Sequence, residues 1–538
     1  MRMGLALLAG LLLASAFPRI GVAGFAWVAP GAILAAAIGA PGRRTFQLGY
    51  VAGLAHYLVS LSWLLRIPVN KLAPISGWLA LSGFLALYTG SWVWLCWRVY
   101  PVKLDGTAGG HSELFERFLS AGWGRRFGWA ISCAALWVTW EMVQARLFSG
   151  FPWNFLGASQ YQMLPLIQVS SCTGVYGVSF LAVWFSVSTL CAVVVVLRRS
   201  QNTRQWLGEL ILPLLVTAGV VSAGIRQLLA PAVAGPSLRV ALVQPSIPQQ
   251  WIWAPGESSN RFAQLLQLSE TAVAQKPDLI VWPEAAVPGF VRWDTNIYQA
   301  VTNFVRRHQA WLVMGSDDVA PARDSRDPGE YDAFNSSFLI SPEGEFRAIY
   351  RKCRLVIFGE YIPFHRWLPF LERWTGMGSF AAGTGPVPFR VPELQLKFSV
   401  LICFEDVFPH GAREYVQDDT DFLLNLTNNG WFGESAAQWQ HAANAVFRAV
   451  ENGVPLVRCA NNGLSCWVDA QGRMQEVYFP GTKDIYGPGV KLVQAPLLAG
   501  RKSERTFYWR HGDMFGWSCL GWSALLLGRP FLRRQPVG

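Results

Sequence analysis

FSVLICFED, residues 398–406, is an apolar run that ends in a thiol and two carboxylates. Such a run predicts a buried strand, with Cys403 at its carboxyl end and Glu405 and Asp406 just beyond it. The carboxyl ends of strands are where α/β sheets hold their catalytic side chains. A single buried cysteine is more often inert core filler, so the interpretation of Cys403 depends on which other side chains reach the same sheet edge.

Two other strand-like runs also end in ionisable side chains. DLIVWPEAAVP delivers Glu284, and SPEGEFRAIYRKCRLVIFGEYIPF delivers Lys352 and Glu360. A thiol with an ordinary pKa of about 8.5 is only slightly ionised at neutral pH, so a nucleophilic Cys403 needs a base or a nearby cation. Glu284 can serve as the base, and Lys352 as the cation that also stabilises an oxyanion. Glu284 or Lys352 taken alone could equally be a solvated surface side chain, so the prediction rests on their occurrence together with Cys403.

The composition indicates a membrane protein. Of 538 residues, 52% are hydrophobic and only 15% are charged, and the mean hydropathy is +0.26. The formal charge is +11, but the basic residues form short clusters between apolar runs, which is typical of membrane topology and not of nucleic-acid binding. There are nine cysteines; a Cys459–Cys466 bridge stays open because spacing alone does not establish one.

Apolar runs long enough to cross about 30 Å of hydrocarbon as a helix recur along the chain. The first run also resembles a signal-peptide core, but a second follows at once, which favours two spanning helices. GVYG at 174–177 predicts a break inside a run that exceeds one span. In all, about eight spans are predicted, near residues 4–19, 21–40, 46–66, 76–98, 127–147, 168–197, 207–228 and 513–530.

Lysine and arginine set the predicted orientation. With the N-terminus in the cytoplasm, the inside loops hold clusters such as Arg43–Arg44 and Arg198–Arg199, whereas the outside connections hold few basic residues. Both termini are therefore expected in the cytoplasm and the long polar segment outside it. The predicted domains are a seven-span bundle over 1–230, a catalytic domain over 236–500, and an eighth span with a cytoplasmic tail over 508–538.

The polar segment is typical of one α/β domain, in which mixed sheets are covered by helices and carry catalytic groups on loops at one rim. Strand-like runs alternate with helical patterns such as 259–275, 295–308 and 436–452. Pro-Glu-Gly at 342–344 predicts a hairpin between paired strands. The seven histidines are scattered, and there is no HExxH, paired CxxC, phosphate loop or G-x-S-x-G motif. We therefore expect no metal, no cofactor and no serine triad.

Four stretches resemble the signatures of the nitrilase (carbon–nitrogen hydrolase) superfamily, whose members use a Glu-Lys-Cys triad. They are WPEAA at 282–286, RKCRLVIFGEYIPF at 351–364, ICFED at 402–406 and NLTNNGWFG at 425–433. The spans before and after the domain narrow the resemblance to the bacterial apolipoprotein N-acyltransferase family. SGFPWNFLG at 149–157, SIPQQWIW at 246–253 and WQHAANAVFRAVENGVPLVRCANNG at 439–463 fit the same family.

The resemblance implies an α-β-β-α sandwich and a role for each matched residue. Glu284 would be the general base, Lys352 the oxyanion-stabilising cation and Cys403 the nucleophile, with Glu360 as a fourth polar residue supporting them. Weaker matches, expected to line the site, are Trp253, Asn335, Glu405 and Arg458. Three positions depart from the family pattern: Phe404 replaces a frequent tyrosine, and Cys353 and Ile357 alter the lysine loop.

The implied reaction is transfer of an acyl chain from a phospholipid, through a cysteine thioester, to the amine of a diacylglyceryl-cysteine apolipoprotein. The expected donor is phosphatidylethanolamine or phosphatidylglycerol, and the expected location is the bacterial inner membrane, with the catalytic domain on the periplasmic side. No nucleic-acid partner is expected. The alternatives are a membrane-tethered amidase or nitrilase, and a non-catalytic receptor or transporter with a nitrilase-like domain.

Overall fold

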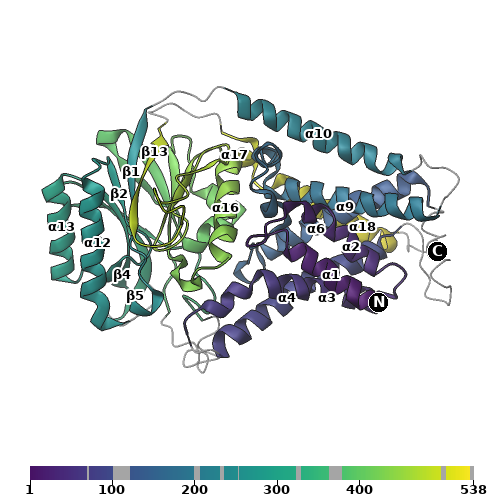
Figure 1. Cartoon of the computed structure of the whole chain (residues 1–538), viewed down its shortest axis with the longest axis horizontal. Helices are drawn as coiled ribbons and strands as arrows, with labels where there is room; N and C mark the ends of the chain where they lie inside the picture. Colours follow the sequence, from purple (N-terminus) through teal and green to yellow (C-terminus); the bar gives the residue numbers. More distant parts are fainter. Residues whose placement is uncertain are drawn as a thin grey trace. The chain divides into compact units, whose positions relative to one another are not determined.

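The computed structural model describes residues 1–69, 72–100, 121–198, 206–230, 236–252, 254–322, 329–362, 379–497 and 505–532. The chain forms two compact units, which are coloured along the sequence in Figure 1. One comprises Met1–Leu65, Ile75–Ala230 and Arg510–Gly538, and is helical. The other comprises Arg66–Pro74 and Pro231–Trp509, and holds the strands.

Two sheets form the centre of the second unit. The first has the strand order β13-β1-β2-β4-β5-β6, with β3 paired to β4, and the second has the order β12-β11-β10-β9-β8-β7. The strands are β1 (Ser237–Gln244), β2 (Leu279–Val281), β3 (Val287–Phe290), β4 (Trp311–Pro321), β5 (Tyr331–Ile340), β6 (Phe346–Arg351), β7 (Pro388–Val391), β8 (Leu396–Ile402), β9 (Phe422–Thr427), β10 (Leu456–Ala460), β11 (Cys466–Val468), β12 (Met474–Gln475) and β13 (Gly489–Pro496).

Helices cover the outer face of each sheet, which makes the unit an α-β-β-α sandwich. α12 (Ser258–Val273) and α13 (Thr295–His308) pack on the first sheet, and α15 (Pro409–Glu414) and α16 (Ala437–Asn452) cover the second (Figure 1). The sheets face each other, since Cys459 Sγ of β10 lies 3.6 Å from Val243 O and 3.4 Å from Val281 O. Every residue of β8 is buried because both faces of its sheet are covered.

Two local predictions for this unit can be checked directly. β5 and β6 pair antiparallel around a turn in which Gly344 has a φ of +78°, so the Pro-Glu-Gly hairpin is confirmed. Cys459 and Cys466 are both buried and unpaired. Short helices α11 (Gln249–Ile252) and α17 (Phe507–His511) complete the described helices of this unit.

Each apolar run predicted as a span folds into a helix near its expected place. These helices are α1 (Arg2–Ala14), α2 (Ala29–Ala36), α3 (Gly42–Ser60), α4 (Leu72–Arg98), α6 (Trp123–Gln144), α9 (Val175–Arg198), α10 (Leu207–Leu229) and α18 (Met514–Leu532). Two one-turn helices, α7 (Leu164–Ile167) and α8 (Ser170–Thr173), precede α9. Gly174, with a φ of +67°, separates α8 from α9, so the predicted break is confirmed.

Three of the described helices are long and apolar enough to cross a membrane: Leu72–Arg98, Val175–Leu197 and Leu207–Leu229. The count of about eight spans is therefore not confirmed. At 1.5 Å per residue, the eight residues of α2 extend only about 12 Å. α6 has 22 residues but carries Arg125, Arg126 and Glu141.

The helical unit is held by close backbone approach and by buried polar contacts. A Cβ at Gly10 of α1 would lie 2.1 Å from Ala52 O of α3, so only glycine permits this packing. Trp92 of α4 donates to Cys133 O of α6 at 2.9 Å. Arg126 of α6 pairs with Glu209 of α10 at 2.6 Å, which neutralises both charges inside the bundle.

Candidate active site

Glu284 follows β2, at the carboxyl end of the first sheet, and is only 6% exposed. Its Oε1 accepts a hydrogen bond from Asn335 Nδ2 at 2.8 Å. Its Oε2 accepts one from the backbone N–H of Asn428 at 2.8 Å. The neighbouring strand β4 approaches so closely that a Cβ at Gly315 would lie 2.7 Å from Glu284 Cα. The carboxylate is therefore held by both sheets.

Lys352 directly follows β6 and continues its pairing, because its backbone N–H donates to Asn335 O at 2.9 Å. The side chain is 1% exposed. Nζ lies 2.8 Å from Glu360 Oε1 and 3.4 Å from Glu284 Oε1. Burial lowers the pKa of Lys352, but the charges of Glu360 and Glu284 outweigh it and leave that pKa well above its ordinary value. Lys352 is therefore a fixed cation.

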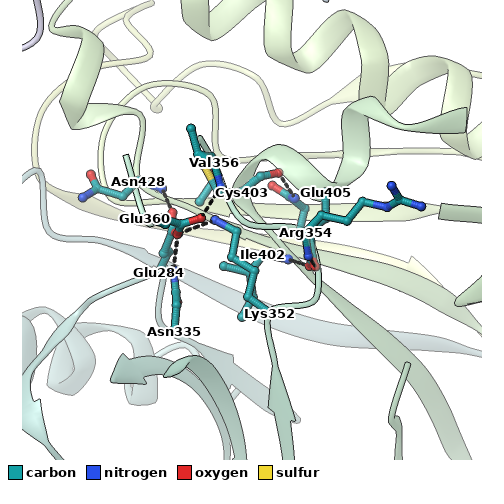
Figure 2. A network of polar contacts seen from close by, with 12 residues as sticks. Glu284, Asn335, Lys352, Arg354, Val356, Glu360, Ile402, Cys403, Glu405 and Asn428 are labelled. Carbon is teal, nitrogen blue, oxygen red and sulfur yellow. Dashed lines mark hydrogen bonds and ion pairs between the residues drawn. The ribbon is translucent and has the colours of Figure 1, made fainter. Parts of the chain in front are cut away.

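Cys403 begins the 3₁₀ turn η7 (Cys403–Val407) immediately after β8. Its φ of +52° lies in the left-handed region, where a non-glycine residue is strained. Figure 2 shows its side chain beside the Lys352 ammonium and the carboxylates of Glu284 and Glu360, all of which act on the thiol electrostatically. The sharp turn thus presents the thiol to charged groups from the other sheet.

The thiol is not activated in the resting site. Burial raises the pKa of Cys403, the Glu284 charge raises it further and the Lys352 charge lowers it, so that it stands at about 12. Sequence reasoning offered Glu284 as a base and Lys352 as a cation that could activate the thiol; in the structure, burial and the Glu284 charge outweigh the effect of the cation on the pKa of Cys403. The surroundings of Cys403 therefore favour the neutral thiol over the thiolate.

Glu405 does not line the site; it fastens two loops together beneath it. The side chain is buried, and its Oε2 accepts the Ile402 N–H at 2.7 Å. Its Oε1 accepts the N–H groups of Cys353 at 2.8 Å and Arg354 at 3.0 Å. Tyr350 also donates to this carboxylate at 2.8 Å. The lysine loop and the cysteine turn are thus tied to one carboxylate, and Cys353 contributes its backbone.

Arg458 is fully buried behind the cysteine turn, so it too is removed from the site surface. It donates to Asp406 Oδ2 at 2.8 Å and to Asn425 Oδ1 at 3.0 Å. Asn425 in turn donates to Cys403 O at 3.0 Å, and His441 Nε2 lies 3.2 Å from the same oxygen. These contacts hold the strained turn from below.

The structure brings together Glu284, Asn335, Lys352, Glu360 and Cys403. Asn335 lies at their centre, since its amide donates to Glu284 at 2.8 Å and to Glu360 at 3.0 Å. Glu405 and Arg458 act one layer below, and Trp253 lies outside the described residues.

Sequence reasoning assigned no role to Asn425, Asn428 or His441. The first two lie in the NLTNNGWFG stretch, which begins on β9 and continues into the turn η8 (Asn429–Phe432). His441 lies on α16. Asn425 and His441 both contact the backbone oxygen of Cys403. Every residue has such an oxygen, so the sequence gives no signal that these two side chains bind there.

Family comparison covers both units. The carbon-nitrogen hydrolase model matches residues 239–485, and the apolipoprotein N-acyltransferase N-terminal domain model matches residues 9–188. The apolipoprotein N-acyltransferase of Geobacter metallireducens is 33% identical over 99% of this chain and 95% of its own length. The chain belongs to the apolipoprotein N-acyltransferase family.

Other members of this family also match most of the chain. The apolipoprotein N-acyltransferase of Brucella melitensis is 32% identical over 88% of this chain and 87% of its own length. That of Vibrio cholerae is 28% identical over the same two shares, 88% and 87%. Glu284, Lys352 and Cys403 all lie within the part that matches the carbon-nitrogen hydrolase model.

Comparison with solved structures also finds a similar chain. It is a mutant of the Nesterenkonia AN1 amidase from the nitrilase superfamily, with 17% identity over 54% of this chain and 98% of that chain. The TM-score is 0.37.

Proposed function

We propose that this apolipoprotein N-acyltransferase family member transfers an acyl chain from a phospholipid to Cys403, and then to the α-amine of a diacylglyceryl-cysteine lipoprotein. The observation that carries the proposal is the Cys403 side chain on a strained turn, beside the Glu284 carboxylate and the Lys352 ammonium. This set matches the chemistry of acyl transfer through a thioester, which needs a nucleophile, a proton acceptor and an oxyanion partner.

The first half-reaction begins with a neutral thiol, so the proton must move as the new bond forms. Glu284 takes the proton from Cys403 while Sγ attacks the ester carbonyl carbon of the phospholipid. Lys352 stabilises the negative charge that develops on the carbonyl oxygen, a contribution on the order of 3 kcal/mol for one donor. Glu284 then returns the proton to the departing oxygen, and a lysophospholipid leaves.

The ion pairs suit this division of labour. Glu360 is closer to Lys352 than Glu284 is, at 2.8 Å against 3.4 Å between Nζ and the respective Oε1. Glu360 therefore holds the cation, and Glu284 keeps proton-accepting capacity. Asn335 donates to both carboxylates and so fixes their relative positions.

The second half-reaction places an amine where the lysophospholipid left. The amine attacks the thioester carbonyl carbon, Glu284 takes a proton from the attacking nitrogen, the C–S bond breaks, and Glu284 passes that proton to the departing sulfur. The product amide is far more stable than the thioester, so transfer runs forward without an external energy source. Chemistry of this kind uses only side chains of the chain and the two lipid substrates.

The lipid nature of the acyl donor explains why the catalytic domain is fused to a helical membrane unit. Transferring an acyl chain into water costs roughly 0.8 kcal/mol per CH₂, so a two-chain lipid does not leave the bilayer to reach a soluble enzyme. The apolar helices of the first unit keep the catalytic domain at the lipid surface. We place the enzyme in the bacterial inner membrane with the sandwich on the periplasmic side, and the donor is phosphatidylethanolamine or phosphatidylglycerol.

Trapping the intermediate tests the proposal. The purified full-length protein is incubated with phosphatidylethanolamine or phosphatidylglycerol vesicles, and intact mass is read with and without a diacylated lipopeptide. The expected result is one added acyl chain on Cys403, lysophospholipid release, and loss of the acyl mass when the lipopeptide is added. Cys403→Ala abolishes all three, whereas Cys172→Ala, at an exposed cysteine of the helical unit, retains them.

The same preparation separates the alternatives. Release of ammonia from small amides, without acylation of Cys403 by lipid, indicates a tethered amidase and overturns the proposal. A Cys403→Ala protein that retains lipopeptide acylation removes the thioester from the mechanism.

A further inference from the structure

The two half-reactions differ in their proton balance. In the first, the proton that leaves the Cys403 thiol ends on the departing lysophospholipid oxygen, so no proton is gained or lost. In the second, the acceptor arrives as an ammonium, because an α-amine has a pKa of about 7.7 to 8.0. Of its three N–H protons, one stays on the amide nitrogen and one reaches the cysteine sulfur through Glu284. The third proton needs another acceptor.

Asp317 lies where such an acceptor is needed. It is on β4, directly opposite Asn335 of β5 in the antiparallel register. Directly opposed residues of an antiparallel pair point to the same face, with Cβ atoms about 5 Å apart. The Asn335 side chain on that face binds Glu284 and Glu360. The Asp317 carboxylate therefore shares the face that holds the catalytic carboxylates.

The next residue shows the contrast. Asp318 points to the opposite face, where it is paired with Arg292 at 2.7 Å and with Arg351 at 2.8 Å. Asp317 has no hydrogen bond or ion pair from its carboxylate to any residue that the structure describes. Asp317 as a whole residue is partly exposed.

The charged groups that face Asp317 come from three elements. Arg261 of α12 is opposite in sign, whereas Glu284 after β2 and Glu360 after β6 are like charges. Burial raises the pKa of Asp317, Glu284 and Glu360 raise it further, and Arg261 lowers it, which leaves it at about 7. A carboxyl group in this range accepts a proton from an α-ammonium at small free-energy difference.

Arg261, which faces Asp317, supplies a second and independent indication that a hydrogen-bonding partner is missing here. Its side chain is 6% exposed, and its Nε finds no hydrogen-bond partner within the described ranges. A buried guanidinium N–H that lacks a hydrogen-bond partner is costly unless a ligand or water completes it.

We propose that Asp317 receives the α-ammonium of the acceptor lipoprotein and takes the proton that aminolysis of the thioester releases. This inference rests on the proposed function. Asp317 first takes one proton from the ammonium, which frees the nitrogen lone pair to form the C–N bond. As the C–S bond breaks, Glu284 takes a second proton from the attacking nitrogen and passes it to the sulfur, and the third N–H stays on the amide. Asp317 then releases its proton to water. The donor half-reaction does not use Asp317.

The two half-reactions are measured separately with Asp317→Asn in the full-length protein. Acylation of Cys403 by phospholipid vesicles should proceed within about twofold of the wild-type rate, because the first step is proton-neutral. Discharge of the preformed thioester by a diacylated lipopeptide should fall on the order of tenfold or more at pH 6.5, where few α-amines are neutral, and approach the wild-type rate near pH 9. Asp317→Glu should restore discharge at pH 6.5.

Two controls isolate the proton transfer. Hydroxylamine is already neutral at pH 7, so it should discharge the thioester of Asp317→Asn and of the wild type at equal rates. Glu393→Gln removes an exposed carboxylate from the turn after β7 and should change neither half-reaction.

Each contrary result has a separate meaning. Absence of a thioester in the wild-type protein overturns the proposed function and this inference with it. A thioester that Asp317→Asn discharges with the wild-type pH profile overturns the inference alone. Slow acylation of Cys403 in Asp317→Asn, or slow discharge by hydroxylamine, also overturns it, because the effect then lies outside the ammonium.

Discussion

Glu360 Oε1 lies 2.8 Å from Lys352 Nζ, and this contact fixes the only described cation among the gathered site residues. Glu284 is the more distant carboxylate, at 3.4 Å. In the proposed mechanism the two carboxylates have different tasks: Glu360 pairs with the lysine, and Glu284 takes the thiol proton. The predictions below test this division and the network that supports it.

Replacing Glu360 by Gln should reduce kcat about 10²-fold, because Lys352 then pairs with Glu284 and neutralises the base. The Gln carbonyl still accepts from Lys352 and Asn335, but its amide nitrogen meets the Val356 N–H that Glu360 Oε2 accepts at 2.9 Å, so a loss of stability on the order of 1 kcal/mol is also expected. Rates of Cys403 acylation and thermal unfolding of the detergent-solubilised protein check both parts. Glu343→Gln, at an exposed position of the β5–β6 hairpin, serves as the control. Unchanged acylation in Glu360→Gln contradicts the assignment.

Alkylation of Cys403 in the absence of lipid should be slow at neutral pH and should rise about tenfold per pH unit up to pH 10 without a plateau. The reason is the thiol pKa of about 12, since only the thiolate reacts and its fraction falls steadily below that pH. Peptide mass spectrometry at Cys403 after timed iodoacetamide exposure measures the rate. A plateau below pH 9 would show a lower pKa.

Glu284→Gln should accelerate this alkylation several-fold while abolishing turnover, because the Glu284 charge raises the thiol pKa. Faster alkylation together with lost turnover is the result expected for a proton acceptor. A residue that only lowers the pKa of the thiol would slow alkylation when it is replaced. The comparison uses the same timed alkylation at a single pH together with lipopeptide acylation. Slower alkylation in Glu284→Gln would falsify the electrostatic account.

Glu405→Gln should lower both stability and acylation. Ile402, Cys353 and Arg354 donate three backbone hydrogen bonds to the carboxylate, and the amide group of Gln places a donor where one oxygen now accepts. Hydrogen bonds to a charged group contribute about 1.5 to 3 kcal/mol each, so a loss on the order of 3 kcal/mol is expected. Denaturant unfolding measures it, and a neutral effect on stability would contradict the fastening role.

Arg458→Met should destabilise the sandwich by about 3 to 5 kcal/mol, because it leaves the buried Asp406 carboxylate without its cation. The apparent KM for the lipopeptide should stay unchanged in the folded fraction, since Arg458 is fully buried and does not reach substrate. Thermal unfolding and steady-state kinetics test the two statements. A raised KM at wild-type stability would return Arg458 to the substrate surface.

Much of the architecture was predictable from local sequence. The apolar run before Cys403, the alternation of strands and helices, and the Pro-Glu-Gly turn are encoded by neighbouring residues, and each appears in the structure. The number of membrane spans was not predictable in this way, because apolar runs such as the one that forms α2 divide into short helices and coil. Apolar composition alone does not show where a helix ends.

For the candidate site, too, some features followed from the sequence and others only from the tertiary structure. Sequence by itself selected Glu284, Lys352, Glu360 and Cys403 as candidate site residues, since each follows a strand-like run or its loop and matches a motif of the family. Only the tertiary structure decided that the thiol rests protonated, that Glu405 lies beneath the site, and that Asp317 faces it. Burial, strand register and through-space charge set these properties, and all three depend on residues that are distant in the chain.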